Sequence, residues 1–315
     1  MRILVTGVAG FIGSHLGEAL LRANHQVIGI DNFSNYYSKK IKKKNLINLQ
    51  KNNNFTFIED DLAYFDLSKV GRIDIVFHES AQPGVRDSWG NNFDNYIKDN
   101  ILVTQRLLEF FKNQKIHKFI FASSSSVYGD SETYPTREDI PLYPISPYGV
   151  SKLAAEKLCY LYYRNYQIPV TMLRYFTVYG SRQRPDMFFN RAIQAAITGS
   201  KLTIFGDGKQ LRDFTHIKDI IQANLACLEN NVEGQVINIG GGSITSINNA
   251  VEIIENISGK QIDKSLGLKE KGDVLITSAD LKKAKKILNY IPTVKLYEGL
   301  CEQVTWQKNI TNYEN

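Results

Sequence analysis

Short apolar runs alternate with longer amphipathic stretches over the first 240 residues of the chain. Stretches with the length and periodicity of helices stand between these runs, notably Asn95–Lys112 and Pro147–Tyr166. Continuous apolar runs separated by helices are typical of parallel strands that are buried on both faces of a sheet, so the pattern predicts an α/β fold with a doubly wound parallel sheet. Its strands would be Ile3–Val5, Val27–Ile30, Phe55–Ile58, Ile73–Phe77, Phe119–Ala122, Val170–Leu173 and Val236–Ile239.

The alternation loosens beyond residue 175, where the loop-rich segments "GSRQRPDM" and "FGDGKQLRD" appear. Helical patterns return at His216–Glu229, Ser246–Ser258 and Asp280–Leu288. We therefore expect two parts. Residues 1–176, to which 216–240 return, would form the sheet domain, and 177–315 would mainly form a smaller lobe.

Composition narrows the class of protein. The chain has 315 residues, 43% of them hydrophobic and 22% charged, which is ordinary for a soluble globular protein. The net charge of +6 is partly concentrated in Lys39–Lys44, which we interpret as a solvated helix face, and no nucleic-acid-binding motif accompanies it. Cys159, Cys227 and Cys301 are far apart and predict neither a disulfide framework nor a metal site. We expect a cytoplasmic protein without a membrane partner, because neither a signal peptide nor an 18-residue apolar run is seen.

The first chemical motif is "LVTGVAGFIGS", which places three glycines between the first strand and the following helix. Gly7 would allow a tight turn, Gly10 a close approach of the backbone to a pyrophosphate, and Gly13 close packing of helix and strand. Asp31 ends the second strand, where a carboxylate can accept both hydroxyls of an adenine ribose and would repel a 2′-phosphate. Together these features predict a Rossmann-type site for NAD and not for NADP.

The second motif combines a run of serines, Ser123–Ser126, with "SPYGVSK". Ser146 and Pro147 are typical of a helix start, which puts Tyr148 and Lys152 on one helix face. The serines could be a soft loop and the pair a packing contact. After a dinucleotide site, we interpret the pair as a proton-transfer device in which the lysine and the cationic cofactor ring lower the pKa of the phenol. A serine at the strand end would hydrogen-bond the same substrate oxygen.

Six segments in order resemble the extended short-chain dehydrogenase/reductase family: "TGVAGFIGSHL", "SSVYG", "SPYGVSK", "LRYFTVYG", "IFGDGKQLRDFTHIKDI" and "VINIGGG". The resemblance implies tightly held NAD, a catalytic set of Ser124, Tyr148 and Lys152, and a nucleotide-sugar substrate bound mainly by the C-terminal lobe. It also implies a homodimer formed through the helices Asn95–Lys112 and Pro147–Tyr166.

The same resemblance implies a set of contacts. NAD would be contacted by Gly7, Gly10, Phe11, Ile12, Gly13, Asp31, Asn32, Asp61, Leu62, Asn100, Lys152 and Tyr175. The nucleotide diphosphate would be held by Thr203, Phe205, Arg212 and Asp273. The segment "FHESAQ" departs from the family pattern, because relatives usually have two small apolar residues after the histidine. Because Glu79 stands at one of these positions, the resemblance does not fix which residues form this part of the wall of the NAD site.

The residues beside Ser124 select among the reactions of the family. By resemblance, dehydratases carry an acid–base carboxyl pair where this chain has Ser125 and Ser126, and decarboxylases usually carry a glutamate next to the serine. Both positions are hydroxyls here. This leaves an isomerase that inverts C4 of a sugar through a transient 4-keto intermediate.

The segments "TVYG.RQRPDM" and "QPGVR.SWGN" look like those of UDP-glucuronic acid 4-epimerases, enzymes that serve polysaccharide biosynthesis. We predict UDP-glucuronic acid as the substrate and UDP-galacturonic acid as the product. Arg184 and Arg86 would then face an anionic group, and Thr177 with Ser125 and Ser126 would supply neutral hydrogen bonds. For each arginine the alternative is a salt bridge that only joins the lobes.

Other activities stay open at this point. The first alternative is a UDP-glucose or UDP-N-acetylglucosamine 4-epimerase. A UDP-glucuronate decarboxylase and a non-catalytic NAD-sensing regulator are further readings, and the intact Tyr148 and Lys152 count against the regulator.

Overall fold

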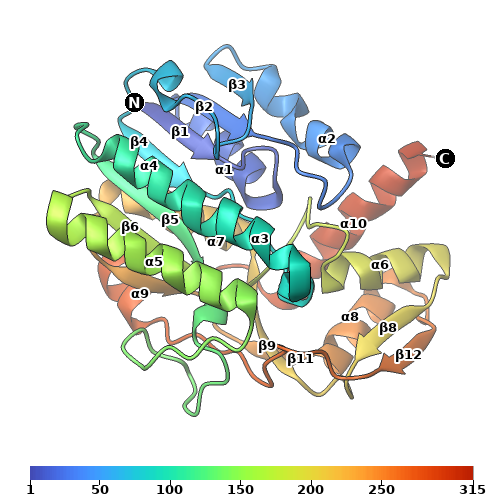
Figure 1. Cartoon of the computed structure of the whole chain (residues 1–315). Helices are drawn as coiled ribbons and strands as arrows, with labels where there is room; N and C mark the ends of the chain where they lie inside the picture. Colours follow the sequence, from blue (N-terminus) through green and yellow to red (C-terminus); the bar gives the residue numbers. More distant parts are fainter. Residues whose placement is uncertain (315) are drawn as a thin grey trace.

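A seven-stranded parallel sheet with helices on both faces forms the centre of the computed structural model, which describes residues 1–314 and the side chains of residues 1–310 (Figure 1). The predicted doubly wound sheet is thereby confirmed. In spatial order its strands are β10 (Val236–Ile239), β6 (Val170–Tyr175), β5 (Lys118–Ser124), β4 (Ile75–His78), β1 (Arg2–Thr6), β2 (Gln26–Asp31) and β3 (Phe55–Glu59).

Alternate residues of the central strands enter two separate cores, because successive side chains of a strand point to opposite faces. Ile3 and Val5 of β1 pack on one face, whereas Leu4 packs on the other. The first core is covered by α1 (Phe11–Arg22), α2 (Lys39–Gln50), α7 (Ile217–Glu229) and α9 (Lys282–Leu288). The second core is covered by α4 (Val103–Phe111) and α5 (Pro147–Tyr166).

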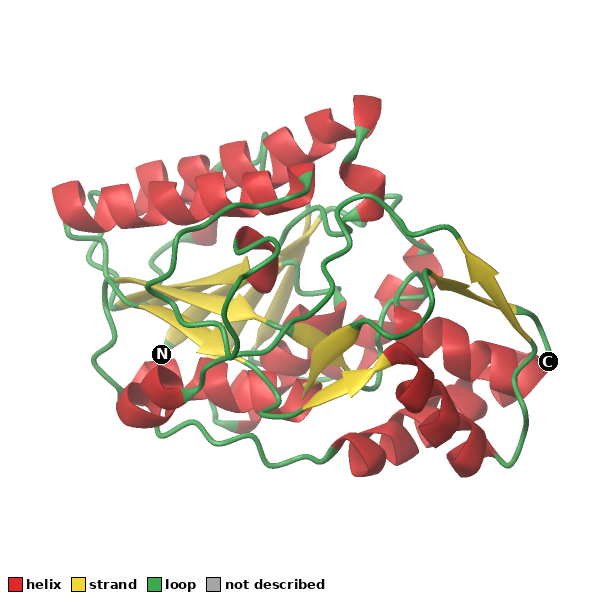
Figure 2. Cartoon of the chain, turned by 90° about the horizontal axis from the view of Figure 1, so that it is seen from below, coloured by secondary structure: helices red, strands yellow, loops and turns green. Residues whose placement is uncertain are grey.

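The C-terminal part adds shorter strands around a third core, and Figure 2 shows them to the right of the long sheet. One small sheet has three strands and another has two. Their strands are β7 (Thr177–Tyr179), β9 (Leu211–His216) and β11 (Ile244–Ser246), and β8 (Leu202–Phe205) and β12 (Lys264–Gly267). The helices of this part are α6 (Phe188–Thr198), α8 (Ile247–Ser258) and α10 (Leu296–Glu314).

The observed helices differ from the predicted ones in ways that have local causes. The predicted helix Asn95–Lys112 consists of α3 (Phe93–Tyr96), a π-helical turn at Ile97–Leu102, and α4. Helices α7 and α8 begin one residue later than predicted, because His216 and Ser246 are their N-caps, whose side chains accept bonds from backbone N–H groups. The last predicted helix begins at Lys282 and not at Asp280.

The lysine run of α2 is not wholly solvated. Lys42 is buried, and its ammonium donates to the backbone oxygen of Ser34 at 2.7 Å. This contact ties α2 to the loop that follows Asp31. Among residues 1–314, no helix combines the length and the apolar character needed to cross a bilayer.

Candidate active site

A cavity of about 760 Å³ lies beyond the carboxyl ends of the strands, and its walls come from both the large sheet and the C-terminal part. Its lining includes the three predicted catalytic residues Ser124, Tyr148 and Lys152. Of the predicted NAD contacts, the lining includes Gly7, Gly10, Phe11, Ile12, Gly13, Asp31, Asn32, Asp61, Leu62, Lys152 and Tyr175. Of the predicted substrate contacts, it includes Arg86, Ser125, Ser126, Thr177, Arg184, Thr203, Phe205, Arg212 and Asp273. The contacts of these residues with ligands stay predictions.

Asn100 is the one predicted contact outside this lining. Its side-chain oxygen accepts from the backbone N–H of Gln82 at 2.7 Å, and its amide donates to the hydroxyl of Ser151 at 2.9 Å. The side chain is buried and its bonding groups are occupied by the protein. In this arrangement Asn100 supports the cavity wall, and its contact with NAD stays a prediction.

The glycine loop has the shape that a phosphate requires. Gly7 has φ +68°, a conformation that favours glycine, and a Cβ at Gly13 would lie 2.2 Å from the Gly7 carbonyl oxygen. Gly10 is the N-cap of α1 and brings no side chain over the helix start. The free N–H groups of this helix end are therefore open to an anion.

Asp31 lies at the end of β2 beside this loop. Its carboxylate accepts from the backbone N–H of Phe33 at 2.8 Å and from that of Ala9 at 3.1 Å. Burial raises the pKa of Asp31, and these bonds together with Lys42 oppose that effect. The two bonds hold the carboxylate in place, and its remaining lone pairs can accept ribose hydroxyls. The loop and this acid fit NAD.

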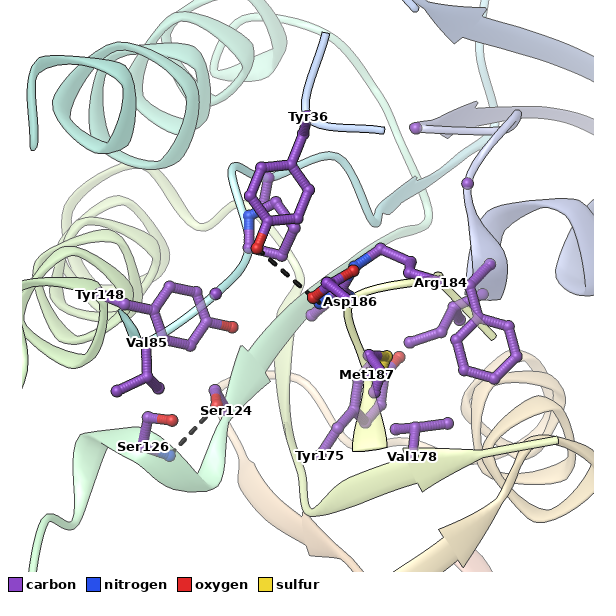
Figure 3. Close-up of a pocket in the computed structure, with 18 of the residues that line it drawn as sticks. Tyr36, Val85, Ser124, Ser126, Tyr148, Tyr175, Val178, Arg184, Asp186 and Met187 are labelled. Carbon is purple, nitrogen blue, oxygen red and sulfur yellow. Dashed lines mark hydrogen bonds and ion pairs between the residues drawn. The ribbon is translucent and has the colours of Figure 1, made fainter. Parts of the chain in front are cut away.

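The Ser-Pro start of α5 aims two side chains at the cavity. The Ser146 hydroxyl accepts from the backbone N–H of Gly149 at 3.1 Å, and Pro147 fills the first turn. Tyr148 and Lys152 follow on one face of the helix. In Figure 3 the Tyr148 hydroxyl points into the cavity, close to Ser124 at the end of β5.

The four serines have different surroundings. Ser123 donates its hydroxyl to the buried carboxylate of Glu156 at 2.7 Å, whereas Ser124 faces Tyr148. Strand β5 ends at Ser124, because Ser125–Val127 form a 3₁₀ turn whose N-cap is Ser124, and the Ser124 hydroxyl accepts from the backbone N–H of Ser126 at 3.1 Å. Ser125 and Ser126 therefore line the cavity as residues of a turn and not of a strand.

Burial dominates the electrostatics of the proton-transfer pair. Burial raises the pKa of Tyr148, whereas a hydrogen bond with Ser124 and the charge of Arg184 lower it. Burial lowers the pKa of Lys152 to about 8, although the negative charge of Glu79 acts to raise it. The lowering of the phenol's pKa that was predicted for the lysine together with the cationic cofactor ring is therefore not seen in the protein alone, because burial outweighs Ser124 and Arg184. An ionised phenol here needs a further positive charge.

A cluster of three arginines beside Phe205 and Asp273 forms the far end of the cavity. The guanidinium of Arg86 lies 4.0 Å from the ring centre of Phe205, and that of Arg191 lies 5.6 Å from it. Asp273 accepts from Arg212 at 3.2 Å and pairs with Arg86 at 3.6 Å. Such a cluster suits a diphosphate. No motif in the sequence points to Arg191, because it lies on an otherwise ordinary amphipathic helix, α6.

Arg184 has a partner that the sequence analysis did not consider. Its guanidinium forms two parallel bonds to Asp186, at 3.0 Å and 2.9 Å, within the loop between β7 and α6. The pair is neither an interlobe salt bridge nor a free cation, so the salt-bridge alternative for Arg184 is wrong. A substrate carboxylate would have to share this arginine with Asp186.

Tyr36 joins three loops over the cavity, as Figure 3 shows in part. Its hydroxyl lies 2.9 Å from a carboxylate oxygen of Asp87 and 3.4 Å from one of Asp186. These loops follow β2, β4 and β7. We call this three-loop contact the tyrosine bridge. No local signal in the sequence points to it.

Comparisons with known proteins agree with this site. A model of the "NAD dependent epimerase/dehydratase family" matches residues 3–240. The chain is 40% identical to a UDP-glucuronate 4-epimerase of Thermodesulfobacterium geofontis, over 97% of this chain and 95% of that protein. It is 46% identical to an uncharacterised UDP-glucose epimerase of Bacillus subtilis, over 98% and 99%. The crystal structure of UDP-glucuronic acid 4-epimerase from Bacillus cereus with UDP-glucuronic acid and NAD superposes with a TM-score of 0.96, at 48% identity over 98% of this chain and 100% of that one.

Proposed function

Because this chain belongs to the NAD-dependent epimerase/dehydratase family, we propose that it converts UDP-glucuronic acid into UDP-galacturonic acid by inverting C4 of the sugar. It is an isomerase in this proposal, and the intermediate is a 4-keto sugar. The observation that carries the proposal is the meeting of Ser124, Tyr148 and Lys152 in the cavity that also holds the glycine loop, with hydroxyls at Ser125 and Ser126 where other chemistries need carboxyl groups.

The glycine loop, Asp31 and the residues around them would hold NAD, which supplies reversible hydride acceptance when it is bound. Tyr148 would take the proton of the C4 hydroxyl and later return it to the same oxygen, once the keto sugar has presented its opposite face. Ser124 would hydrogen-bond the same oxygen. Lys152 and the positive cofactor ring would together offset the burial that raises the pKa of Tyr148.

The residues near C6 of the sugar would keep its carboxylate. A 4-keto derivative of glucuronic acid is a β-keto acid, which loses CO₂ when the carboxylate bond aligns with the carbonyl π system. Ser125, Ser126 and Thr177 line the cavity and offer neutral hydroxyls that can hold the group out of alignment. Hydrogen bonds to the carboxylate also oppose its conversion to neutral CO₂. Arg184 would add positive charge while it stays paired with Asp186.

We assign the nucleotide diphosphate to the C-terminal part, 177–315, and NAD to residues 1–176 with 216–240. Arg191 and Arg212 of the C-terminal part support this division, because they lie beside the ring of Phe205 and the carboxylate of Asp273 of the same part. Arg86 joins this cluster from the N-terminal part. Arginine forks match phosphate oxygens, and an aromatic face can stack on a base.

We also propose that the chain acts in the cytoplasm, in polysaccharide biosynthesis, and as a homodimer. The homodimer is supported by apolar side chains that remain exposed along the π-helical turn and α5. They are Ile97, Leu102, Val150, Tyr160 and Leu161. Large exposed apolar groups on neighbouring helices often mark a contact with another chain.

A UDP-glucose 4-epimerase is the second candidate, and the Arg184–Asp186 pair favours it. With its arginine already paired, the C6 end of the site offers mainly neutral hydroxyls, which also suit a CH₂OH group. Incubation of the purified chain with UDP-glucuronic acid, UDP-glucose and UDP-N-acetylglucosamine, followed by NMR, separates the two. We expect a C4 epimer to form fastest from UDP-glucuronic acid. Faster conversion of UDP-glucose would select the second candidate.

A further inference from the structure

Glu79 is a half-buried residue on the cavity wall, and its carboxyl group has an unusual set of partners, with the Oε2 atom itself buried. Its Oε1 accepts from the hydroxyl of Tyr175 at 3.0 Å. The Tyr175 oxygen lies 2.8 Å from the amide nitrogen of Asn224, which can donate to it and so leaves the phenol proton for Glu79. Among the described residues, Oε2 of Glu79 has no hydrogen-bond donor. The side chain is thus fixed on one oxygen and unsatisfied on the other.

A buried carboxylate with one hydrogen bond is costly unless a positive charge lies nearby. Burial raises the pKa of Glu79 to about 7, which the Tyr175 bond and the charge of Lys152 oppose. The other titratable neighbours are neutral near pH 7, because burial lowers the pKa of His78 to about 3 and raises those of Tyr175 and Cys227. Within this set Lys152 is the only cation.

Tyr148 and Lys152 line the same cavity as Glu79. Their proposed role in proton transfer determines where the nicotinamide ring of NAD must lie. The ring has to reach the sugar carbon whose hydroxyl meets Tyr148. It is positively charged when oxidised and neutral when reduced. A fixed negative charge near it therefore stabilises the oxidised form alone.

We propose that Glu79 is the buried counter-charge of the oxidised nicotinamide ring and makes the site prefer NAD over NADH. This inference rests on the proposed function, since it needs the ring beside Tyr148. The preference keeps the 4-keto intermediate short-lived, because return of the hydride to the sugar restores the charge that Glu79 stabilises. It also depends on pH: a protonated Glu79 cannot distinguish the two forms, so the preference grows as the carboxyl ionises.

The test is a competition between the two forms of the cofactor. The full-length protein is incubated with equal excess amounts of NAD and NADH at pH 6 and pH 8.5 until exchange is complete, then freed of unbound cofactor and denatured, and the released dinucleotides are quantified. For wild type, we expect the bound NAD:NADH ratio to rise about tenfold between the two pH values, the factor equivalent to one pKa unit of interaction between charges. Glu79→Gln and Glu79→Leu should show a lower ratio that changes less with pH, and the remaining change would come from Lys152, whose pKa is about 8. Glu132→Gln, an exposed control outside the cavity lining, should match wild type.

The same ratio and pH dependence in wild type and in both Glu79 variants would overturn the inference while leaving the proposed function intact. A wild-type protein that retains neither dinucleotide would overturn the proposed function and the inference with it. If Glu79→Gln folds poorly, Glu79→Leu decides, because leucine leaves no unsatisfied polar atom at the position.

Discussion

Tyr148 occupies a position at which burial and catalysis make opposite demands on its pKa. Burial favours the neutral phenol, whereas proton abstraction needs the phenolate. Within the protein, Ser124 and Arg184 oppose the effect of burial but do not cancel it. In the function proposed above, the site would therefore acquire its base only when bound NAD adds positive charge, so that proton transfer would occur only with the cofactor in place.

Replacement of Tyr148 tests this residue directly. Tyr148→Phe keeps the ring and removes the ionisable oxygen, so we expect kcat to fall by roughly 10²–10⁴ while KM changes little. Steady-state kinetics with UDP-glucuronic acid measure both. Tyr166→Phe, which changes an exposed tyrosine at the end of the same helix, is the control. Near-normal kcat in Tyr148→Phe would place the base elsewhere.

Thr177 tests how the sugar carboxylate is held. Thr177→Ala removes one hydroxyl from the cavity wall, so the carboxylate of the 4-keto intermediate should reach the aligned geometry more often. We expect slower epimerisation and a measurable fraction of UDP-4-keto-pentose or UDP-pentose, detected by mass spectrometry as loss of CO₂. Thr305→Ala, on the surface of α10, should give none. Clean epimerisation by Thr177→Ala at the wild-type rate would remove Thr177 from the carboxylate site.

Glu79 gives the NAD-free protein a pH-dependent stability. Its pKa in the folded chain is about 7, above the ordinary 4.5, so the folded state binds this proton more tightly than the unfolded state does. The stabilisation is fully present below about pH 4.5 and is lost as the pH rises to about 7. The difference between these two pKa values corresponds to about 3 kcal/mol in the free energy of unfolding. Urea unfolding at pH 5 and pH 8 should show that Glu79→Gln gains stability relative to wild type at the higher pH. If the difference in free energy of unfolding between the variant and wild type is the same at both pH values, the pKa assigned to Glu79 is contradicted.

At the scale of elements, the tyrosine bridge links the loops after β2, β4 and β7 across the cavity. Tyr36→Phe removes the hydroxyl that joins Asp87 and Asp186 and leaves the ring in place. Because a hydrogen bond to a charged group contributes about 1.5–3 kcal/mol, we expect bound NAD to dissociate roughly tenfold faster or more. The loss of NAD during dialysis measures this. Tyr64→Phe, at a largely exposed residue, is the control, and equal retention by wild type and Tyr36→Phe would show that the bridge does not hold the cofactor.

The sequence could predict the helices and strands of the large sheet because their signals are local. The apolar runs became strands, and the Ser-Pro start of α5 fell at the predicted residue. The tyrosine bridge had no such signal, since Tyr36 and Asp186 are 150 residues apart. The π-helical turn could not be predicted for a different reason. Its pattern of apolar residues differs little from that of an α-helix.

At the scale of the whole molecule, the cavity depends on both parts of the chain. The glycine loop, Asp31 and the catalytic pair come from the large sheet and its helices, whereas Phe205, Arg191 and the other residues of the far end come mainly from the C-terminal part. Their motifs could be read from the sequence one by one. Their convergence follows only from the packing of the two parts, whereas the pairing of Arg184 with Asp186 is local to one loop.

The central claim is that C4 is inverted by removal and return of the same hydrogen within one site. The most direct measurement uses UDP-glucuronic acid deuterated at C4 and follows the product by NMR and mass spectrometry. We predict UDP-galacturonic acid with the deuterium retained at C4 and with no hydrogen from the solvent at that carbon. A product that carries solvent hydrogen at C4, or no C4 epimer at all, would contradict the account.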